Sequence, residues 1–516
     1  MSETDAAVAE SISTHARAEA VAGGARLAAI AELATRRLGS ELARDRERWA
    51  CDAWDSVGAE VAAELTTGHR AASSMLHQGL DLRDRLPRIG ALLANGDIPL
   101  RVATTATYRT GLIDDDELVA RVDADLAEKA TRFGKMSDRK LIDEVDACIE
   151  RHDPDAARRF RTVERGMDVR FGKRDDDTGT RSVYGRVKIT DAEVADRRME
   201  QMAKSVCPND PRTHGERRTE AFGIVNAGGS HLPCLCGQAD CPAPGGPDAR
   251  ATHFGILVLT NDPGDPDGPG EPDGPHDDTG GDGPSGPYGP EDPEDREDVP
   301  TEDVVPEATP SPPARCSYTS LIAGGGAVPA PLLAELRRMG VAVRPVATSE
   351  ELAADAGYRP TTSQQRFVRA RDMTCCFPGC DHPAEHCDID HTIPYETSRL
   401  THPSNLEALC RKHHLLKTFW VGRGGWTDEQ LADGTVVWTT PSGRRRTVPP
   451  GSRIHYPGWE TTTPAPRAPV PPGPPAPDRG LTMPLRTRTR AQQRLANIRA
   501  ERERNRQLGA DEPPPF

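Results

Sequence analysis

The sequence predicts a multidomain protein. It comprises a mainly α-helical N-terminal domain with a small α+β continuation, a long disordered acidic linker, and a compact metal-binding module near the C-terminus. Three observations predict this organisation. The chain has 516 residues, enough for roughly two to four domains. Only 36% of the residues are hydrophobic, whereas Gly and Pro number 47 each, which favours folded parts joined by disordered parts. Nine of the twelve cysteines fall into two clusters, in the regions 207–241 and 375–410.

Residues 1–165 are predicted to form a helical accessory domain. Val57, Val61 and Leu65 recur at helical spacing, and similar runs follow further along the segment. Within it, residues 57–83 are predicted to form two helices around a turn at residues 66–69. That pair is either a hairpin of a helical bundle or a DNA-reading helix-turn-helix, and the lack of a basic face in the sequence favours the hairpin.

Residues 166–260 are predicted to continue the fold as an α+β part that carries a cluster of cysteines. Segments with alternating or β-branched residues predict strands, and longer amphipathic segments predict helices. The expected strands are residues 167–171, 183–190 and 252–260, and the expected helices are residues 191–206 and 213–227.

Residues 261–313 are predicted to be a disordered acidic linker, followed by a short α/β segment over 314–357. Within residues 261–303, sixteen Asp and Glu stand against one Arg, and ten Pro and nine Gly leave almost nothing that packs. This segment carries the whole net charge of −15, so the other 473 residues sum to zero. The acidity is therefore local, and it does not exclude a nucleic-acid partner for the rest of the chain.

Four Cys and His side chains near the C-terminus have the spacing of a tetrahedral zinc site. They are Cys375, Cys380, Cys410 and His413. The first two flank a Pro-Gly turn, and the last two lie three residues apart on a predicted helix, so each pair faces one side. Three residues compete for the same positions, namely Cys376, Cys387 and His414. The spacing favours the first set and leaves the alternatives open.

Four other polar groups in the same stretch are of the kind that phosphodiester hydrolysis uses: Asp390, His391, Asn405 and His414. A carboxylate suits Mg²⁺ or Mn²⁺, and an imidazole has the near-neutral pKa that a general base needs. Neighbouring residues on a helix point about 100° apart, so one of His413 and His414 can serve zinc and the other a catalytic ion. The alternative is that both histidines belong to one structural site and nothing is catalytic; the combination of residues favours catalysis.

Residues 358–421 resemble the HNH endonucleases, whose fold is a β-hairpin and a helix around a metal ion, in many members beside a zinc site. The match rests on Asp390-His391, Asn405, His414 and the cysteine pairs. The resemblance implies that His391 is the general base, that Asp390 and His414 hold a catalytic Mg²⁺ or Mn²⁺, and that Asn405 orients the hairpin. His413 stands where many members have a second Cys, and His is itself a competent zinc ligand.

We therefore expect a metal-dependent HNH endonuclease that hydrolyses phosphodiester bonds in DNA, with double-stranded DNA as its partner and a structural Zn²⁺ beside the catalytic ion. The alternative is a zinc-stabilised nucleic-acid-binding or regulatory protein of a mobile element, with little or no cleavage activity. The presence of Asp390, His391, Asn405 and His414 together favours the enzyme.

The upstream part resembles the uncharacterised domain that precedes HNH modules in a large actinobacterial family of repeat-associated proteins. The resemblance is carried by Leu86-Pro87, Asp210-Pro211-Arg212 and Cys234-Leu235-Cys236-Gly237. It implies kinship and no particular activity. The cysteines in this region form either a second structural zinc site or a set of reduced thiols in a loop. The candidate ligands are Cys207, Cys234, Cys236 and Cys241, with His231 as a rival of Cys207.

Residues 422–450 are predicted to form a β-hairpin extension of the nuclease module, with Asp433-Gly434 as its turn. Three arginines follow at a strand end, and with Lys417 they are assigned to nucleic-acid binding through phosphate. They are Arg444, Arg445 and Arg446. The alternative for the arginines is a solvated turn.

Residues 451–516 are predicted to be a Pro-rich and then Arg-rich tail. Its part from 485 to 507 holds eight Arg and two Glu, which indicates either a solvated charged helix or a basic arm on nucleic acid. The longest aliphatic run, residues 254–259, is far short of the roughly 20 residues that span a bilayer. The N-terminus has no apolar core of signal-peptide type, so we expect no membrane partner and a cytoplasmic protein.

Overall fold

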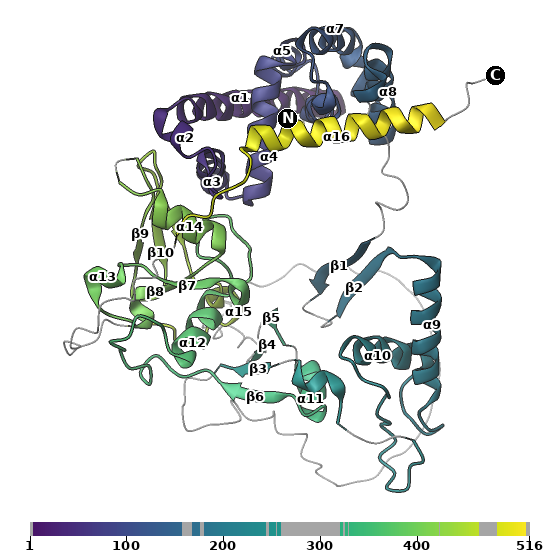
Figure 1. The fold of residues 1–516 in the computed structure, drawn as a ribbon, viewed down its shortest axis with the longest axis vertical. Helices are drawn as coiled ribbons and strands as arrows, with labels where there is room; N and C mark the ends of the chain where they lie inside the picture. The colour runs from purple at the N-terminus through teal and green to yellow at the C-terminus, as the bar shows by residue number, and fades with distance from the viewer. Residues whose placement is uncertain are drawn as a thin grey trace, which may run out of the picture.

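The computed structural model describes residues 4–156, 168–175, 180–243, 247–253, 255–259, 320–322, 326–328, 330–422, 424–463 and 482–511. The predicted linker over 261–313 lies outside these residues. Figure 1 shows a helical N-terminal region, a few small sheets, and a C-terminal helix that returns to the N-terminal helices.

The N-terminal region is helical, as the sequence predicted. All its helices except the short α2 contribute to one apolar core. A 3₁₀ turn at Thr110–Leu112 separates α6 from α7, and a second one at Pro154–Ala156 follows α8. The helices are α1 (Asp5–Leu38), α2 (Glu41–Asp45), α3 (Ala53–Leu65), α4 (His69–Asp84), α5 (Pro87–Ala94), α6 (Leu100–Arg109), α7 (Asp116–Phe133) and α8 (Asp138–His152). Ten of the thirteen residues of α3 are buried, so α3 and α4 form a hairpin inside the bundle.

The central part has the predicted mixture of strands and helices. β1 (Asp168–Asp175) and β2 (Thr180–Arg186) pair antiparallel, followed by α9 (Ile189–Lys204) and α10 (His214–Asn226). The strand expected over 183–190 begins and ends earlier, at Thr180–Arg186, and α9 already begins at Ile189. A four-stranded sheet then has the order β5-β4-β3-β6 and packs with α11 (Ala330–Arg338). Its strands are β3 (Gly255–Val258), β4 (Ser320–Ile322), β5 (Gly326–Ala327) and β6 (Ala342–Pro345).

The cysteine-rich C-terminal module is built on a β-hairpin followed by a helix. α12 (Thr362–Asp372) precedes β7 (Asp388–His391), which pairs antiparallel with β8 (Leu406–Leu409), and α14 (Arg411–Phe419) follows directly. The short helix α13 (Tyr395–Ser398) lies in the connection between the two strands. The register places Asp390 opposite Glu407, so polar groups of both strands meet on the side where α14 packs.

The predicted hairpin extension is present with its turn at Asp433-Gly434. β9 (Thr427–Gln430) and β10 (Val436–Thr439) pair antiparallel, and β11 (Arg445–Val448) adds a third strand. Gly434 has a φ of 82°, which explains glycine at this turn position. The helix α15 (Ser452–His455) follows the sheet.

The N-terminal helices and the C-terminal module share a hydrophobic core. Alanines of α2 and α3 pack in one cluster with Phe377, Trp426 and Trp438. The indole of Trp420 donates a hydrogen bond of 2.9 Å to the carbonyl of Cys51 and lies edge-to-face with Trp49. The two parts are therefore joined by buried apolar contact as well as by polar groups.

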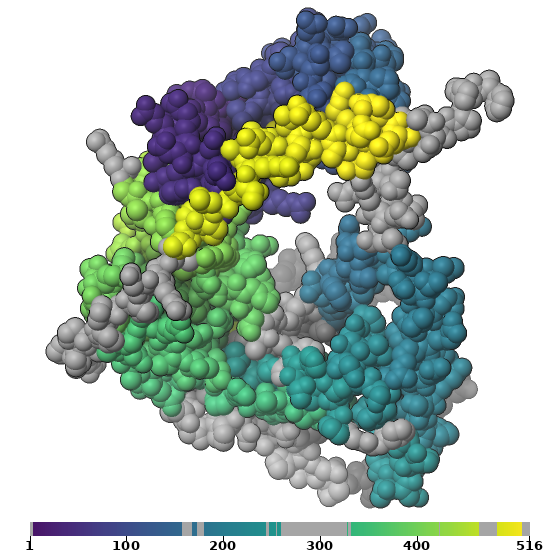
Figure 2. Space-filling model, viewed as in Figure 1, coloured from purple at the N-terminus to yellow at the C-terminus, as the bar shows by residue number. Residues whose placement is uncertain are grey.

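The Arg-rich tail forms α16 (Arg490–Asp511), which packs along the helical domain (Figure 2). Arg502 pairs with Asp153 at 2.6 Å, and the backbone N–H of Ala50 bonds to the carbonyl of Pro484 at 2.8 Å. The sequence suggested a solvated helix or a free basic arm. The structure instead docks this helix on the chain's own acidic groups. Within the described residues, no helix combines the length and apolarity needed to cross a membrane.

Candidate metal centres and active-site cluster

The C-terminal module brings four ligands together. The ligand atoms of Cys375, Cys380, Cys410 and His413 all lie within 4.8 Å of one another. Cys375 and Cys380 flank a turn that requires Gly379 at a φ of 76°, and Cys410 caps α14 while His413 lies in its first turn. His413 Nδ1 is 3.4 Å from the sulfur of Cys375 and 3.3 Å from that of Cys410.

Three thiols and one imidazole in this arrangement are compatible with structural zinc. Hydrogen bonds from the Cys375 and Cys380 thiols lower the pKa of Cys410, so the thiolate form of Cys410 is favoured. The rivals Cys376, Cys387 and His414 lie outside the group of four. The geometry therefore matches the set that the spacing favoured.

A second cluster in the central part has four sulfur ligands. Those of Cys207, Cys234, Cys236 and Cys241 also lie within 4.8 Å of one another, which is compatible with a second structural zinc. The rival ligand His231 is not a member of the group.

An acidic side chain and an arginine hold the loop that carries three of these cysteines. The carboxylate of Asp210 accepts a bond of 2.9 Å from the backbone N–H of Leu235, between Cys234 and Cys236. Arg212 binds the same carboxylate and the carbonyl of Pro233, at 2.7 Å each. Both residues are buried, so the loop is fixed by charge-assisted hydrogen bonds.

His414 lies between two carboxylates of β7. Its Nε2 is 3.3 Å from Asp390 Oδ1, and its Nδ1 is 2.8 Å from Asp388 Oδ2. Burial lowers the pKa of His414, but the two carboxylates outweigh burial and raise it above its usual value. Sequence reasoning missed Asp388. The signal was available, because residues two apart on a strand share a face.

His391 is buried beside a hydroxyl that fixes its tautomer. Its Nε2 is 2.9 Å from Thr401 Oγ1, and that hydroxyl donates its single proton to the carbonyl of Gly357 at 2.6 Å. Thr401 must therefore accept from His391, so Nε2 carries the proton and Nδ1 keeps its lone pair. The ring of Tyr358 stacks on the imidazole at 5.7 Å. Burial lowers the pKa of His391, which favours the neutral form of a base.

Asn405 fixes the loop that follows β7. Its amide oxygen accepts a 2.7 Å bond from the N–H of Ile393, and its amide nitrogen donates to the carbonyl of the same residue at 3.1 Å. The oxygen also accepts from the hydroxyl of Thr392 at 2.9 Å. These bonds hold the segment directly after His391.

Lys417 does not have the exposed position that the nucleic-acid prediction required. Its ammonium lies among three carboxylates, at 2.8 Å from Glu407, 3.0 Å from Asp390 and 3.0 Å from Asp428. It also donates a 2.9 Å bond to the carbonyl of His391. The prediction that Lys417 contacts phosphate is therefore wrong: the side chain is buried and forms ion pairs with carboxyl groups of its own chain.

The three arginines after β10 also have partners within the chain. Arg444 is 2.9 Å from Glu64 at the end of α3, and Arg446 pairs with the same carboxylate. Arg445 pairs with Glu429 across the sheet at 3.0 Å. The structure thus gives these side chains carboxylate partners where the sequence suggested phosphate.

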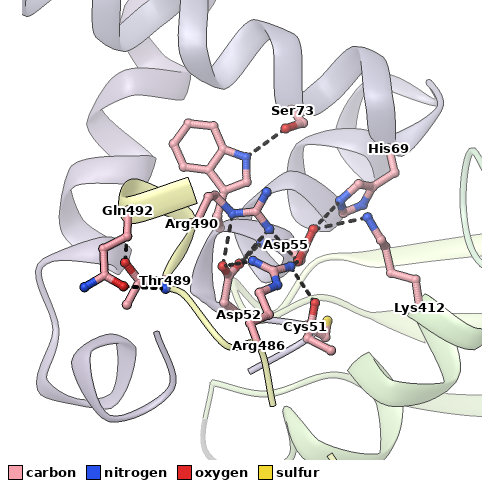
Figure 3. Close-up of polar contacts among 12 residues, drawn as sticks. Cys51, Asp52, Asp55, His69, Ser73, Lys412, Arg486, Thr489, Arg490 and Gln492 are labelled. Carbon is pink, nitrogen blue, oxygen red and sulfur yellow. Dashed lines mark hydrogen bonds and ion pairs between the residues drawn. The ribbon is translucent and has the colours of Figure 1, made fainter. Parts of the chain in front are cut away.

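Two arginines of the tail converge on the N-terminus of α3, beside α14 (Figure 3). Arg486 and Arg490 each bind both Asp52 and Asp55, at 2.7 to 3.0 Å. Lys412 of α14 approaches Asp55 at 3.1 Å. Burial raises the pKa of Asp55, but a hydrogen bond from His69 and the cations Lys412 and Arg490 outweigh burial and hold this pKa below its usual range.

Known proteins match nearly the whole chain. Residues 14–252 match the family model described as a domain of unknown function, DUF222. Uncharacterized protein Rv3776 of Mycobacterium tuberculosis is 45% identical over 513 residues, 99% of this chain and 92% of the relative. The chain belongs to the same family as Rv3776 and contains a DUF222 domain. A second relative, uncharacterized protein Rv2100 of the same organism, is 45% identical over 522 residues, 99% of this chain and 90% of its own length.

The family relationship adds no activity to the site. The DUF222 match ends before the C-terminal module, although it includes the four clustered cysteines of the central part. A further relative from Mycobacterium tuberculosis, the uncharacterized protein in the est 3′ region, is 40% identical over 363 residues, 70% of this chain and 95% of its own length. No solved structure matches the chain.

Proposed function

We propose that this protein is a metal-dependent endonuclease of the HNH type that hydrolyses phosphodiester bonds in DNA. One observation carries the proposal. His414 Nε2 on α14 and Asp390 Oδ1 on β7 face each other at 3.3 Å, and His391 is the next residue along the same strand. An imidazole and a hard carboxylate thus converge on one point beside a candidate base, on a hairpin-and-helix frame.

The donors fit a divalent ion such as Mg²⁺ or Mn²⁺, which water and phosphate oxygens would help to coordinate. Such an ion, when bound, supplies a Lewis acid for the scissile phosphate and the leaving oxygen. Asp390 and His414 would hold it. Among the described residues, neither Asp390 nor His414 belongs to a cluster of three or more candidate metal ligands. The protein would therefore supply only these two ligands and leave the other coordination positions of the ion open.

His391 is the proposed general base. Its protonated Nε2 is committed to Thr401, which leaves the lone pair of Nδ1 to accept a proton from the attacking water. Asn405 keeps the loop after His391 in place through both ends of its amide. The zinc-compatible cluster at His413 lies one residue before His414, so the same helix presents one histidine to each site.

Nicking of supercoiled plasmid by the purified full-length protein tests the proposal. We expect cleavage with Mg²⁺ or Mn²⁺ and none with EDTA, and we expect His391→Ala to abolish most of it. His386→Ala is the matched control, because His386 is exposed on the same module. DNA binding without cleavage in either metal would reject the enzyme and support the alternative, a zinc-stabilised DNA-binding or regulatory protein.

A further inference from the structure

Two buried nitrogen atoms at the junction between the helical domain and the C-terminal module have no hydrogen-bond partner among the described residues. They are His413 Nε2 on α14 and His69 Nδ1 at the start of α4. The two imidazole rings lie edge-to-face with centroids 6.0 Å apart. A buried polar atom without a partner costs about 1–3 kcal/mol, so this pairing calls for an explanation.

The chemistry of the two rings is complementary. His413 turns Nδ1 toward the sulfurs of Cys375 and Cys410, so its Nε2 carries the proton when Nδ1 is a ligand. His69 turns Nε2 toward Asp55 at 3.2 Å. An ionised carboxylate accepts only, so the proton of a neutral His69 sits on Nε2 and its Nδ1 offers a lone pair. One ring is a donor and the other an acceptor.

Asp55 is held firmly enough to orient His69. Only 3% of Asp55 is exposed, and its oxygens take Lys412, Arg486 and Arg490 at 2.7 to 3.1 Å besides the imidazole. Figure 3 shows these side chains directed at the same carboxylate from the helical domain, the tail and α14. The elements packed around His69 thus fix the carboxylate on one side and leave the His413 ring on the other.

We propose that His69 and Asp55 form the outer shell of the C-terminal zinc site, with His69 accepting from His413 Nε2–H directly or through one water. Zinc-ligating histidines characteristically pass their second N–H to such an acceptor, which sets the tautomer and ring orientation of the ligand. Here the acceptor belongs to the helical domain, so that domain completes a metal centre of the C-terminal module. The inference depends on the zinc cluster and is independent of DNA cleavage.

Two substitutions at one position test this role in the full-length, zinc-loaded protein. His69→Leu keeps apolar volume and removes the acceptor. His69→Asn is smaller but keeps an amide oxygen near the place of Nδ1. Outer-shell losses typically weaken metal binding by about 10- to 100-fold. We expect that loss for His69→Leu in chelator competition, and substantial recovery for His69→Asn, whereas a residue that only fills space would show the opposite order.

His152→Leu is the matched control, because His152 lies at the end of α8 in the same helical domain and contacts Asp125 rather than the zinc cluster. It should leave zinc affinity within about twofold of the parent, and the cluster at Cys207 provides an internal reference in the same chain. Equal zinc affinity of the parent and His69→Leu would overturn the proposal. So would an affinity lower in His69→Asn than in His69→Leu, or an equal loss in His152→Leu, since each would indicate general loosening of the bundle.

Discussion

Lys417 Nζ lies 3.0 Å from Asp390 Oδ2, while the other oxygen of that carboxylate faces His414. Burial raises the pKa of Asp390, but Lys417 and His414 together hold it below its usual range. The two oxygens of the Asp390 carboxylate thus have different partners: Oδ2 contacts Lys417 and Oδ1 contacts His414. Because Oδ2 is committed to Lys417, only Oδ1 is directed toward the proposed ion.

Replacing Lys417 with Met should destabilise the fold strongly. Lys417 lies among three carboxyl groups, including the fully buried Glu407, and removing the cation leaves the ionised Asp390 without its buried partner. Breaking a buried pair in this way typically costs about 3–5 kcal/mol. Urea unfolding would measure the loss. Lys204→Met removes an exposed helix pair with Glu200 and should change stability by less than about 0.5 kcal/mol. Equal effects of the two variants would contradict the buried role.

His391→Ala should separate catalysis from folding. Loss of a general base typically lowers the rate by about 10²–10⁴-fold, so plasmid cleavage should fall by that factor. Zinc content and DNA binding should stay near those of the parent, because His391 is not in the zinc-compatible cluster. Cleavage, a zinc assay and a DNA-binding assay on one preparation would check this. Zinc loss in this variant would count against the separation.

Cys410→Ala and His414→Ala should differ in zinc content. Cys410 is one of the four clustered ligands, so its loss should release zinc and leave residues 358–421 open to protease. His414 lies outside that cluster and faces Asp390, so His414→Ala should keep its zinc and lose Mg²⁺-dependent cleavage. If His414→Ala instead loses zinc as Cys410→Ala does, the roles assigned to His413 and His414 are reversed.

Much of the fold and of the candidate site follows from local sequence. Helical spacing predicted α3 and α4 with the turn between them, and β-branched segments predicted β1 and β2. These signals work because each element's own residues determine its periodicity. The spacing of Cys375 and Cys380 predicted that these two thiols form one ligand pair for the same reason, since a short turn brings both thiols to one side.

What local sequence did not predict are contacts between distant segments. The arginines of the tail predicted either a solvated charged helix or a basic arm, but Arg486 and Arg490 contact Asp52 and Asp55, more than four hundred positions earlier. Lys417 read as a phosphate contact for a similar reason. A charge run identifies a polar surface, but the tertiary fold decides whether its partner is phosphate, water or the chain's own carboxylates.

Gly379→Ala should disturb the contact between the Cys375–Cys380 turn and the turn that joins α3 to α4. A Cβ on Gly379 would lie 2.5 Å from the carbonyl oxygen of Thr67, and Gly379 also has a φ of 76°. Gly443 has nearly the same φ, 78°, with nothing within 4 Å of an added Cβ. Gly443→Ala therefore measures the conformational cost alone, about 1–2 kcal/mol. Urea unfolding should show that Gly379→Ala lowers the free energy of unfolding by about 1–3 kcal/mol more than Gly443→Ala does. Equal losses in the two variants would mean that the Cys375–Cys380 turn is not in close contact with Thr67.

Tail docking should weaken in acid because of His77. Arg494 of α16 donates a 2.9 Å bond to His77 Nδ1, which requires the neutral ring. Burial, with Arg494 and Arg490, lowers the pKa of His77 to about 4. The unfolded chain takes up this proton near its ordinary pKa of about 6.5, before the folded chain does. Stability from His77 is therefore complete above pH 6.5 and decreases as the pH falls toward 4.

Comparison with His77→Gln isolates the effect of His77 protonation on stability, because the glutamine oxygen can still accept a hydrogen bond from Arg494 but does not titrate. The free energy of unfolding of the parent minus that of the variant should be constant above pH 6.5 and should decline between pH 6.5 and about 4. Proteolysis of α16 over the same range should increase in the parent and change less in the variant. A difference that is independent of pH would show that His77 takes up its proton over the same pH range in the folded and the unfolded chain, and that the contact with Arg494 does not hold the tail.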